Sequence, residues 1–85
     1  MTTLMLLLAR HDMQETLPLR TVSEDYFEMK PDAFERKIKQ GKVDLGLPPK
    51  EIQLLKSRGV PLTVLARYID TRRRKANRAL EEDHH

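Results

Sequence analysis

Apolar residues recur along the chain at spacings that divide it into short elements. Leu4 to Leu8 form an unbroken apolar run within residues 3–10, and periodicity alone assigns such a run to neither a helix nor a strand. We favour a short helix there. In residues 19–27 the apolar side chains lie at roughly helical spacing with acidic side chains on the outward side, which predicts a two-turn helix.

Proline and glycine mark the ends of the next predicted helix, residues 31–40. Pro31 suits the first turn of a helix, where its missing N–H group costs nothing, and Gly41 is a natural stop after the last turn. Only residues 28–30 separate this helix from the one before it. A connection this short is typical of a helix-turn-helix, which we expect over residues 19–41.

A hairpin is predicted for residues 43–60. Apolar residues alternate with Asp44 and Gly46 in residues 43–47, and this period of two is typical of a short strand. A second strand is expected over residues 52–56 or as far as residue 60. The two strands would form a wing beside the helix-turn-helix.

The longest predicted helix covers residues 61–80, where apolar residues recur at i, i+3, i+4 and i+7 after Pro61. The side chains expected in the core are Tyr26, Phe27, Phe34, Ile38, Leu62, Leu65 and Ile69. These elements predict one domain, residues 1–85, of the α+β class and mainly α. Its expected architecture is a small winged helix-turn-helix, similar in layout to excisionases, with a two-stranded wing and a C-terminal helix.

Composition agrees with a small globular domain. A chain of 85 residues has room for one modest core, and 34% charged with 39% hydrophobic residues is ordinary for a folded protein. With no cysteine, disulfides and thiolate metal sites are excluded, and a reducing cytoplasm is the expected compartment. The apolar run near the start is too short for a membrane span and no basic residue precedes it, so we expect no signal peptide and no membrane partner.

Charge is distributed unevenly along the chain. The formal net charge is +3, but residues 1–29 are acidic and residues 30–80 are basic. A basic middle and rear suit a polyanionic partner, so a nucleoid-associated protein is expected. Few aromatic residues are free to stack on bases, because those present are expected in the core, so double-stranded DNA is favoured over single strands.

The outward side of the helix at residues 31–40 carries the most specific candidates. Arg36 can pair with guanine and Gln40 with adenine in the major groove, while lysines nearby would reach phosphates. A solvated helix has a similar mixture of residues, and the short turn before this helix is what favours recognition. The expected DNA contacts are Lys30, Asp32, Arg36, Lys37, Lys39, Gln40, Lys42, Lys50, Lys56, Arg58, Arg72, Arg73 and Lys75.

The sequence offers little for catalysis, and no enzyme is expected. A nucleophile needs a base and an orienting group, and His11, Ser23 and Ser57 do not imply such a trio. The glycines lack the spacing of a phosphate-binding loop. We therefore expect no cofactor and no metal.

Several segments, taken in order, resemble the pyocin activator proteins, small phage-related regulators that activate bacteriocin gene clusters. The matching segments are Leu6 to Arg10, Glu24 to Phe27, Arg36 to Ile38 leading to Gly41, Leu47-Pro48, Lys56-Ser57, Gly59-Val60 and Leu65 to Asp70. The resemblance implies a transcriptional activator that binds promoter DNA of bacteriocin or prophage genes. The chain departs from the family at Lys30, where such proteins tend to have threonine, and at Pro49, Leu54 and Leu55 in the wing.

The partners expected are double-stranded promoter DNA, a second copy of the chain as a homodimer or bound in tandem, and RNA polymerase. Two alternatives remain open for the function. One is an excisionase-like architectural protein that bends DNA. The other is a phage-encoded protein-interaction module or inhibitor that uses the acidic helix at residues 19–27 and the apolar front of the chain.

Overall fold

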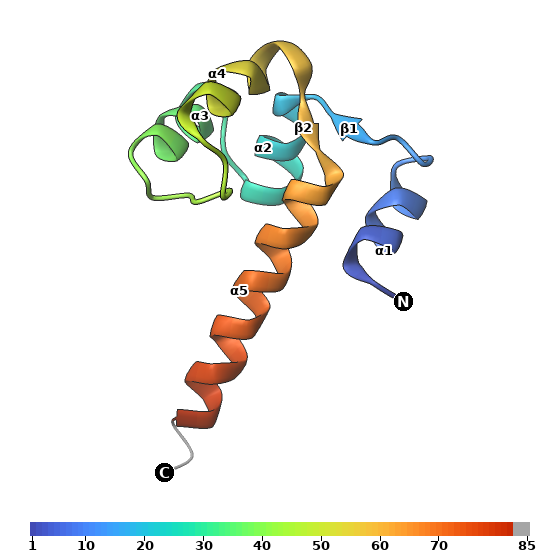
Figure 1. Ribbon diagram of the computed structural model, residues 1–85, viewed down its shortest axis with the longest axis vertical. Coiled ribbons are helices and arrows are strands. Elements are labelled where there is room, and N and C mark those ends of the chain that lie inside the picture. Colours follow the sequence, from blue (N-terminus) through green and yellow to red (C-terminus); the bar gives the residue numbers. More distant parts are fainter. Residues whose placement is uncertain (83–85) are drawn as a thin grey trace.

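Five helices and two short strands make up residues 1–82, the part of the chain that the computed structural model describes (Figure 1). In chain order they are α1 (Thr3–Arg10), β1 (Thr16–Leu17), α2 (Leu19–Phe27), α3 (Pro31–Lys39), α4 (Pro49–Arg58), β2 (Val60–Pro61) and α5 (Leu62–Glu82). The fold is mainly helical with one small antiparallel sheet. Among the described residues, no helix combines the length and the apolar character that crossing a bilayer requires.

The two strands join parts of the chain that are far apart in sequence. β1 and β2 are antiparallel, with Leu17 opposite Val60. The backbone N–H of Leu62 donates to the carbonyl of Glu15 at 2.8 Å, which extends the pairing into the first turn of α5. The sheet therefore holds the start of α2 beside the start of α5.

The core lies between α2, α3, the sheet and the first half of α5. Phe34, Leu62 and Leu65 are fully buried. The ring of Phe27 packs against that of Phe34 at a centroid distance of 4.4 Å and against that of Tyr68 at 5.1 Å. This aromatic contact ties α3 to α2 and α5, and the side of α3 predicted to face inward is confirmed.

α1 packs along α5 and is tied to two other helices by polar side chains. Leu7 is buried in this contact. The hydroxyl of Thr3 donates to the carboxylate of Asp70 on α5, and His11, just after α1, is hydrogen-bonded to the hydroxyl of Tyr26 on α2. The helix predicted for residues 3–10 is confirmed.

The predicted ends of α2 and α3 agree with the structure to within one residue. Gly41 follows α3 with φ +77°, and its N–H donates to the carbonyl of Ile38 at 3.1 Å. The N–H of Lys42 donates to the carbonyl of Lys37 at 2.9 Å. This pair of bonds is the Schellman motif, which satisfies the last carbonyls of a helix and needs a residue with positive φ.

The hairpin predicted for residues 43–60 is wrong. Val43 and Leu45 are buried as their alternation predicts, but the segment that contains them pairs with no strand among the described residues. Residues 49–58 form α4, because Pro49 occupies the first turn of a helix and Glu51 favours its positive N-terminal end. The strand that does form, β2, pairs with β1 instead of with residues 43–47.

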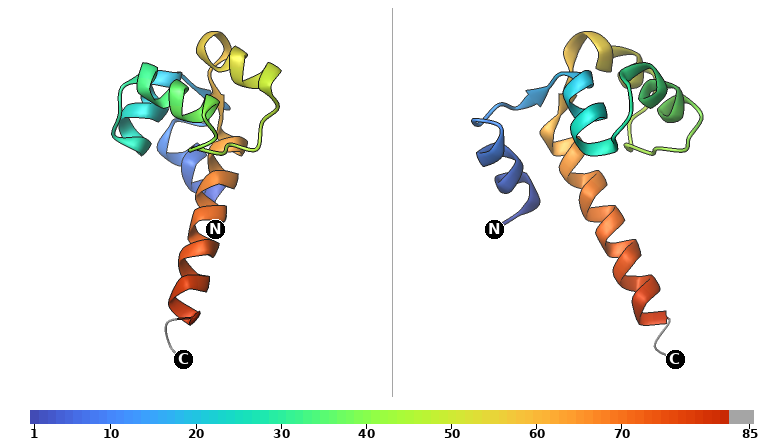
Figure 2. Two further views of the ribbon diagram at one scale, coloured as in Figure 1. Left: turned by 90° about the vertical axis from the view of Figure 1, so that its left-hand side faces the viewer. Right: turned by 180° about the vertical axis from the view of Figure 1, so that it is seen from behind.

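α5 is longer than the core that it covers. Its first half packs against the sheet and α1, and its C-terminal half projects away from the other elements in every view (Figures 1 and 2). All side chains from Arg72 to Leu80 are exposed. The predicted helix over residues 61–80 is confirmed, except that Pro61 belongs to β2 and the helix begins at Leu62.

Replacing Gly59 with alanine should destabilise the fold by about 2–3 kcal/mol. Gly59 has φ +86° and ψ 177°, a conformation that costs other residues about 1–3 kcal/mol, and a Cβ there would lie 2.7 Å from the carbonyl oxygen of Leu17 in β1. Gly41→Ala is the matched control, since Gly41 also has positive φ but has open space around it. Chemical denaturation should show the larger loss for Gly59→Ala; equal losses would mean that the close contact with β1 does not matter.

Phe34→Ala should lower the free energy of unfolding by about 3–5 kcal/mol, because it leaves a cavity where a fully buried ring meets Phe27. Thermal melting followed by circular dichroism would measure this loss. A variant as stable as the parent protein would contradict the packing of α3 described here.

Candidate nucleic-acid interface

The outward face of α3 is polar and largely cationic. Phe34 and Ile38 point into the core, and Arg36 lies on the opposite side of the helix with its side chain exposed. Asp32 and Gln40 are exposed as well. The helix therefore offers solvent the side chains that the sequence pattern assigned to its outward face.

Two ion pairs link charged side chains within single helices. Lys39 Nζ lies 3.1 Å from the carboxylate of Glu35 on α3, and Arg20 Nε lies 3.8 Å from that of Glu24 on α2. Both pairs have i, i+4 spacing and are largely exposed, so each contributes only a few tenths of a kcal/mol to stability. Lys39 and Arg20 remain accessible to a partner.

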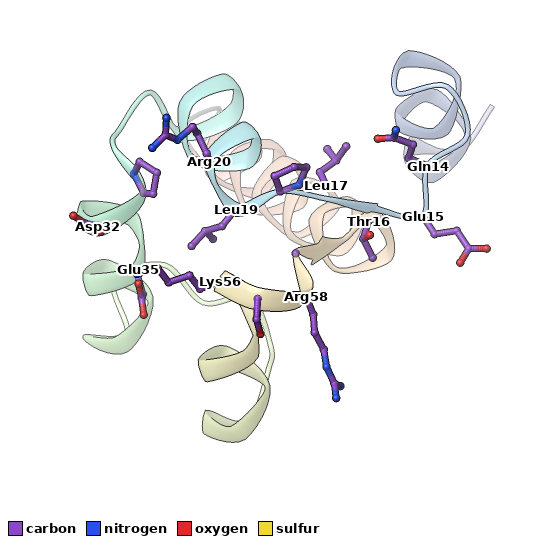
Figure 3. A pocket seen from close by; sticks show the side chains of 14 residues that line it. Gln14, Glu15, Thr16, Leu17, Leu19, Arg20, Asp32, Glu35, Lys56 and Arg58 are labelled. Carbon is purple, nitrogen blue, oxygen red and sulfur yellow. The ribbon is translucent and has the colours of Figure 1, made fainter.

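A groove separates α3 from the start of α2 and the end of α4 (Figure 3). In Figure 3 the side chain of Lys56 extends from α4 towards α3, whereas that of Arg58 points out into solvent. The charged residues of the wall are evenly divided: Arg20, Lys56 and Arg58 are cationic, and Glu15, Asp32 and Glu35 are acidic. The groove is therefore not a basic channel.

A second hollow adjoins the first at the N-terminal end of α3. It brings Lys30 together with Arg20 and Lys56, but Glu24, Glu28 and Asp32 line it too. Opposite charges again balance. The end of α3 nearest to α2 thus carries no excess of positive charge.

The excess of positive charge lies at the other end of α3. Arg36, Lys37 and Lys39 fall in its last turn and Lys42 is the last residue of the Schellman motif, all of them exposed. Cations here also face the negative end of the helix dipole, which favours them. The C-terminal half of α3 is consequently the most basic part of the helix.

The remaining predicted contacts lie on two other helices. Lys50 is in the first turn of α4, while Lys56 and Arg58 are near its end, so these side chains stand on a helix and not on the predicted wing. Arg72, Arg73 and Lys75 are on the projecting half of α5. The structure therefore brings Asp32, Lys56 and Arg58 together around the groove and Lys30 into the hollow beside it, and it leaves the α5 cations apart from them.

The connection between α2 and α3 is tight. Glu28 adopts the left-handed conformation, with φ 53° and ψ 41°, and the N–H groups of Glu28 and Met29 both donate to the carbonyl of Ser23. This arrangement ends α2 and turns the chain into α3 within residues 28–30, as predicted. It places a strained acidic residue beside Lys30.

The polar residues considered for catalysis are engaged locally. His11 is bonded to Tyr26, and the hydroxyls of Ser23 and Ser57 donate to backbone carbonyls of their own helices at 3.0 and 3.2 Å. These side chains stabilise helices and the contact between α1 and α2.

Two basic residues of the candidate interface were not predicted from the sequence. Arg20 lines both hollows, but the sequence around it is acidic and gave no hint of this position. Arg67 lies in α5 beside the loop that follows α3, since a Cβ built on Gly46 would be 3.8 Å from its Nη1. The seven-residue spacing from Arg67 to Arg74 was the available signal for Arg67.

The arrangement is that of a small helical protein with two consecutive helices joined by a tight turn and with cationic side chains exposed on three helices. No curated protein and no solved structure matches the chain significantly. A protein-family model, described as pyocin activator protein PrtN, matches residues 3–76. The chain belongs to this family, and membership places it among transcriptional regulators of the activator kind.

Glu28→Gly should raise the free energy of unfolding by about 0.5–1 kcal/mol. The left-handed conformation costs a residue with a side chain about 1–2 kcal/mol, and glycine removes this cost. Part of the gain in stability is lost, because glycine makes the unfolded chain more flexible. Glu28→Gln is the control, because it removes the charge and keeps the backbone strain. If both variants gain equally in urea denaturation, charge and not strain is the cause.

Proposed function

We propose that the protein is a sequence-specific activator that binds double-stranded promoter DNA of bacteriocin or prophage-type genes. In this proposal α3 enters the major groove, and residues on α4 contact the adjacent backbone. Recruitment of RNA polymerase would follow from an activator role, and the site of action would be the nucleoid.

The observation that carries the proposal is the position of Arg36. It stands opposite the buried Phe34 on a helix that a short turn separates from α2, and nothing else in the described part of the chain covers it. A helix in the major groove needs an outward face with a forked donor that can pair with guanine, and phosphate-binding cations next to it. Membership of a family of activators adds independent support.

The charge distribution suggests which part of α3 meets the duplex. The N-terminal end of α3 is balanced by Glu28 and Asp32, whereas Lys37 and Lys42 lie near its C-terminal end. Because the phosphate backbone repels carboxylates and attracts ammonium groups, we place the C-terminal half of α3 closest to the DNA.

Arg36→Ala should reduce affinity for the specific site by about 1–3 kcal/mol and relax preference at one base pair, with little change on random duplex. The specific site is first identified by selecting bound sequences from a random duplex library. Titrations of selected and scrambled duplexes at several salt concentrations then measure the difference.

Lys50→Ala is the matched control. It also removes one exposed positive charge, from the far end of α4, and should leave base preference intact. If Arg36→Ala weakens selected and scrambled duplexes equally, α3 does not read the sequence. If the library yields no enriched sequence and the parent protein binds no duplex, DNA binding itself is refuted.

A further inference from the structure

The C-terminal half of α5 carries a dense group of cations with no packing role. Arg72 to Lys75 are four consecutive basic residues, and their side chains are exposed on a part of the helix that contacts no other element. Like charges on one helix repel each other by amounts similar to the gain from opposite pairs. Which of these side chains can reach a common partner depends on the direction in which each one points from the helix axis.

The position of Arg67 shows which side of α5 faces the end of α3. The guanidinium of Arg67 lies beside Gly46, in the loop that leaves the C-terminal end of α3. Val43 and Leu45 of this loop are part of the core, which keeps the loop in place against the first half of α5. The side of α5 that carries Arg67 thus faces the same region as the basic end of α3.

Helical geometry shows which residues nearer the C-terminus lie on the same side of α5 as Arg67. Successive residues turn by about 100°, so Arg74 and Arg78 lie within about 20° of Arg67, while Arg72 and Arg73 are turned away by more than about 100°. A hydrogen bond of 3.5 Å from Arg74 Nη2 to the hydroxyl of Thr71 shows that the Arg74 side chain lies along this side. We call Arg67, Arg74 and Arg78 the basic stripe.

Nearby carboxylates do not neutralise the first two members of the basic stripe. Asp44 accepts a hydrogen bond from the N–H of Gly46 at 2.8 Å, and Asp70 accepts one from Thr3. Neither carboxylate forms an ion pair with Arg67 or Arg74 in the described part of the chain. Their positive charge is available to a partner.

We propose that the basic stripe of α5 is a second DNA contact, which follows the phosphate backbone of the duplex that α3 reads. This inference rests on the proposed function. Arg67 and Arg74 are about 10 Å apart along the helix and Arg78 follows after about 6 Å, so the stripe is about 16 Å long and each of its three cations can meet a phosphate of one strand. Lys42, exposed just after α3, is in the same loop as Gly46, beside which Arg67 lies.

The test compares two double variants with the same loss of charge. Arg67→Gln with Arg74→Gln removes two cations from the basic stripe. Arg72→Gln with Arg73→Gln removes two from other sides of the same helix, which the sequence pattern alone assigned to DNA, so the comparison decides between the two sets. All four positions are exposed, and circular dichroism checks that each variant is folded. The probe is a 30-base-pair duplex of mixed sequence, titrated between 50 and 200 mM salt.

We expect the stripe variant to lose roughly tenfold or more in affinity and to reduce the log-log salt slope by about two, since each phosphate contact contributes about 0.9. The other variant should change both quantities much less. Equal losses, or a larger loss for Arg72→Gln with Arg73→Gln, would overturn the basic stripe and leave the reading role of α3 untouched. A parent protein that binds no duplex would refute both proposals together.

Discussion

The pairing of Leu17 with Val60 is the contact on which the rest of the fold depends. It consists of a two-residue ladder, yet it sets the start of α2 beside the start of α5 and closes the core around Phe34. The close approach of Gly59 to the carbonyl of Leu17 makes the register of this ladder specific, because any side chain there would push the strands apart. α1 and α4 then pack against the elements that the sheet holds together.

Helices could be predicted from the sequence far better than strands. The spacing of Leu62, Leu65 and Ile69 and the stop at Gly41 are local signals, and both appear in the structure. The alternation of residues 43–47 is an equally local signal, but it reports burial and does not reveal a partner strand. The partner of β2 lies near the start of the chain, and nothing in the spacing of apolar residues links two segments so far apart.

The outward face of α3 could also be predicted, whereas the grouping of charges around it could not. Helical periodicity is enough to set Arg36 opposite Phe34. The balance of cations and carboxylates in the groove depends on how α2 and α4 pack against α3, which only tertiary structure determines. Because of that balance, the excess of positive charge lies at the C-terminal end of α3 and on α5.

The long interval between β1 and β2 also has a consequence for folding during synthesis. Residues 18–59 lie between the two strands, so the chain can form α2 and α3 locally but cannot close its core until β2 and the first turns of α5 have emerged from the ribosome. Until then the ring of Phe34 can pack against that of Phe27, but Phe27 lacks its contact with Tyr68 of α5.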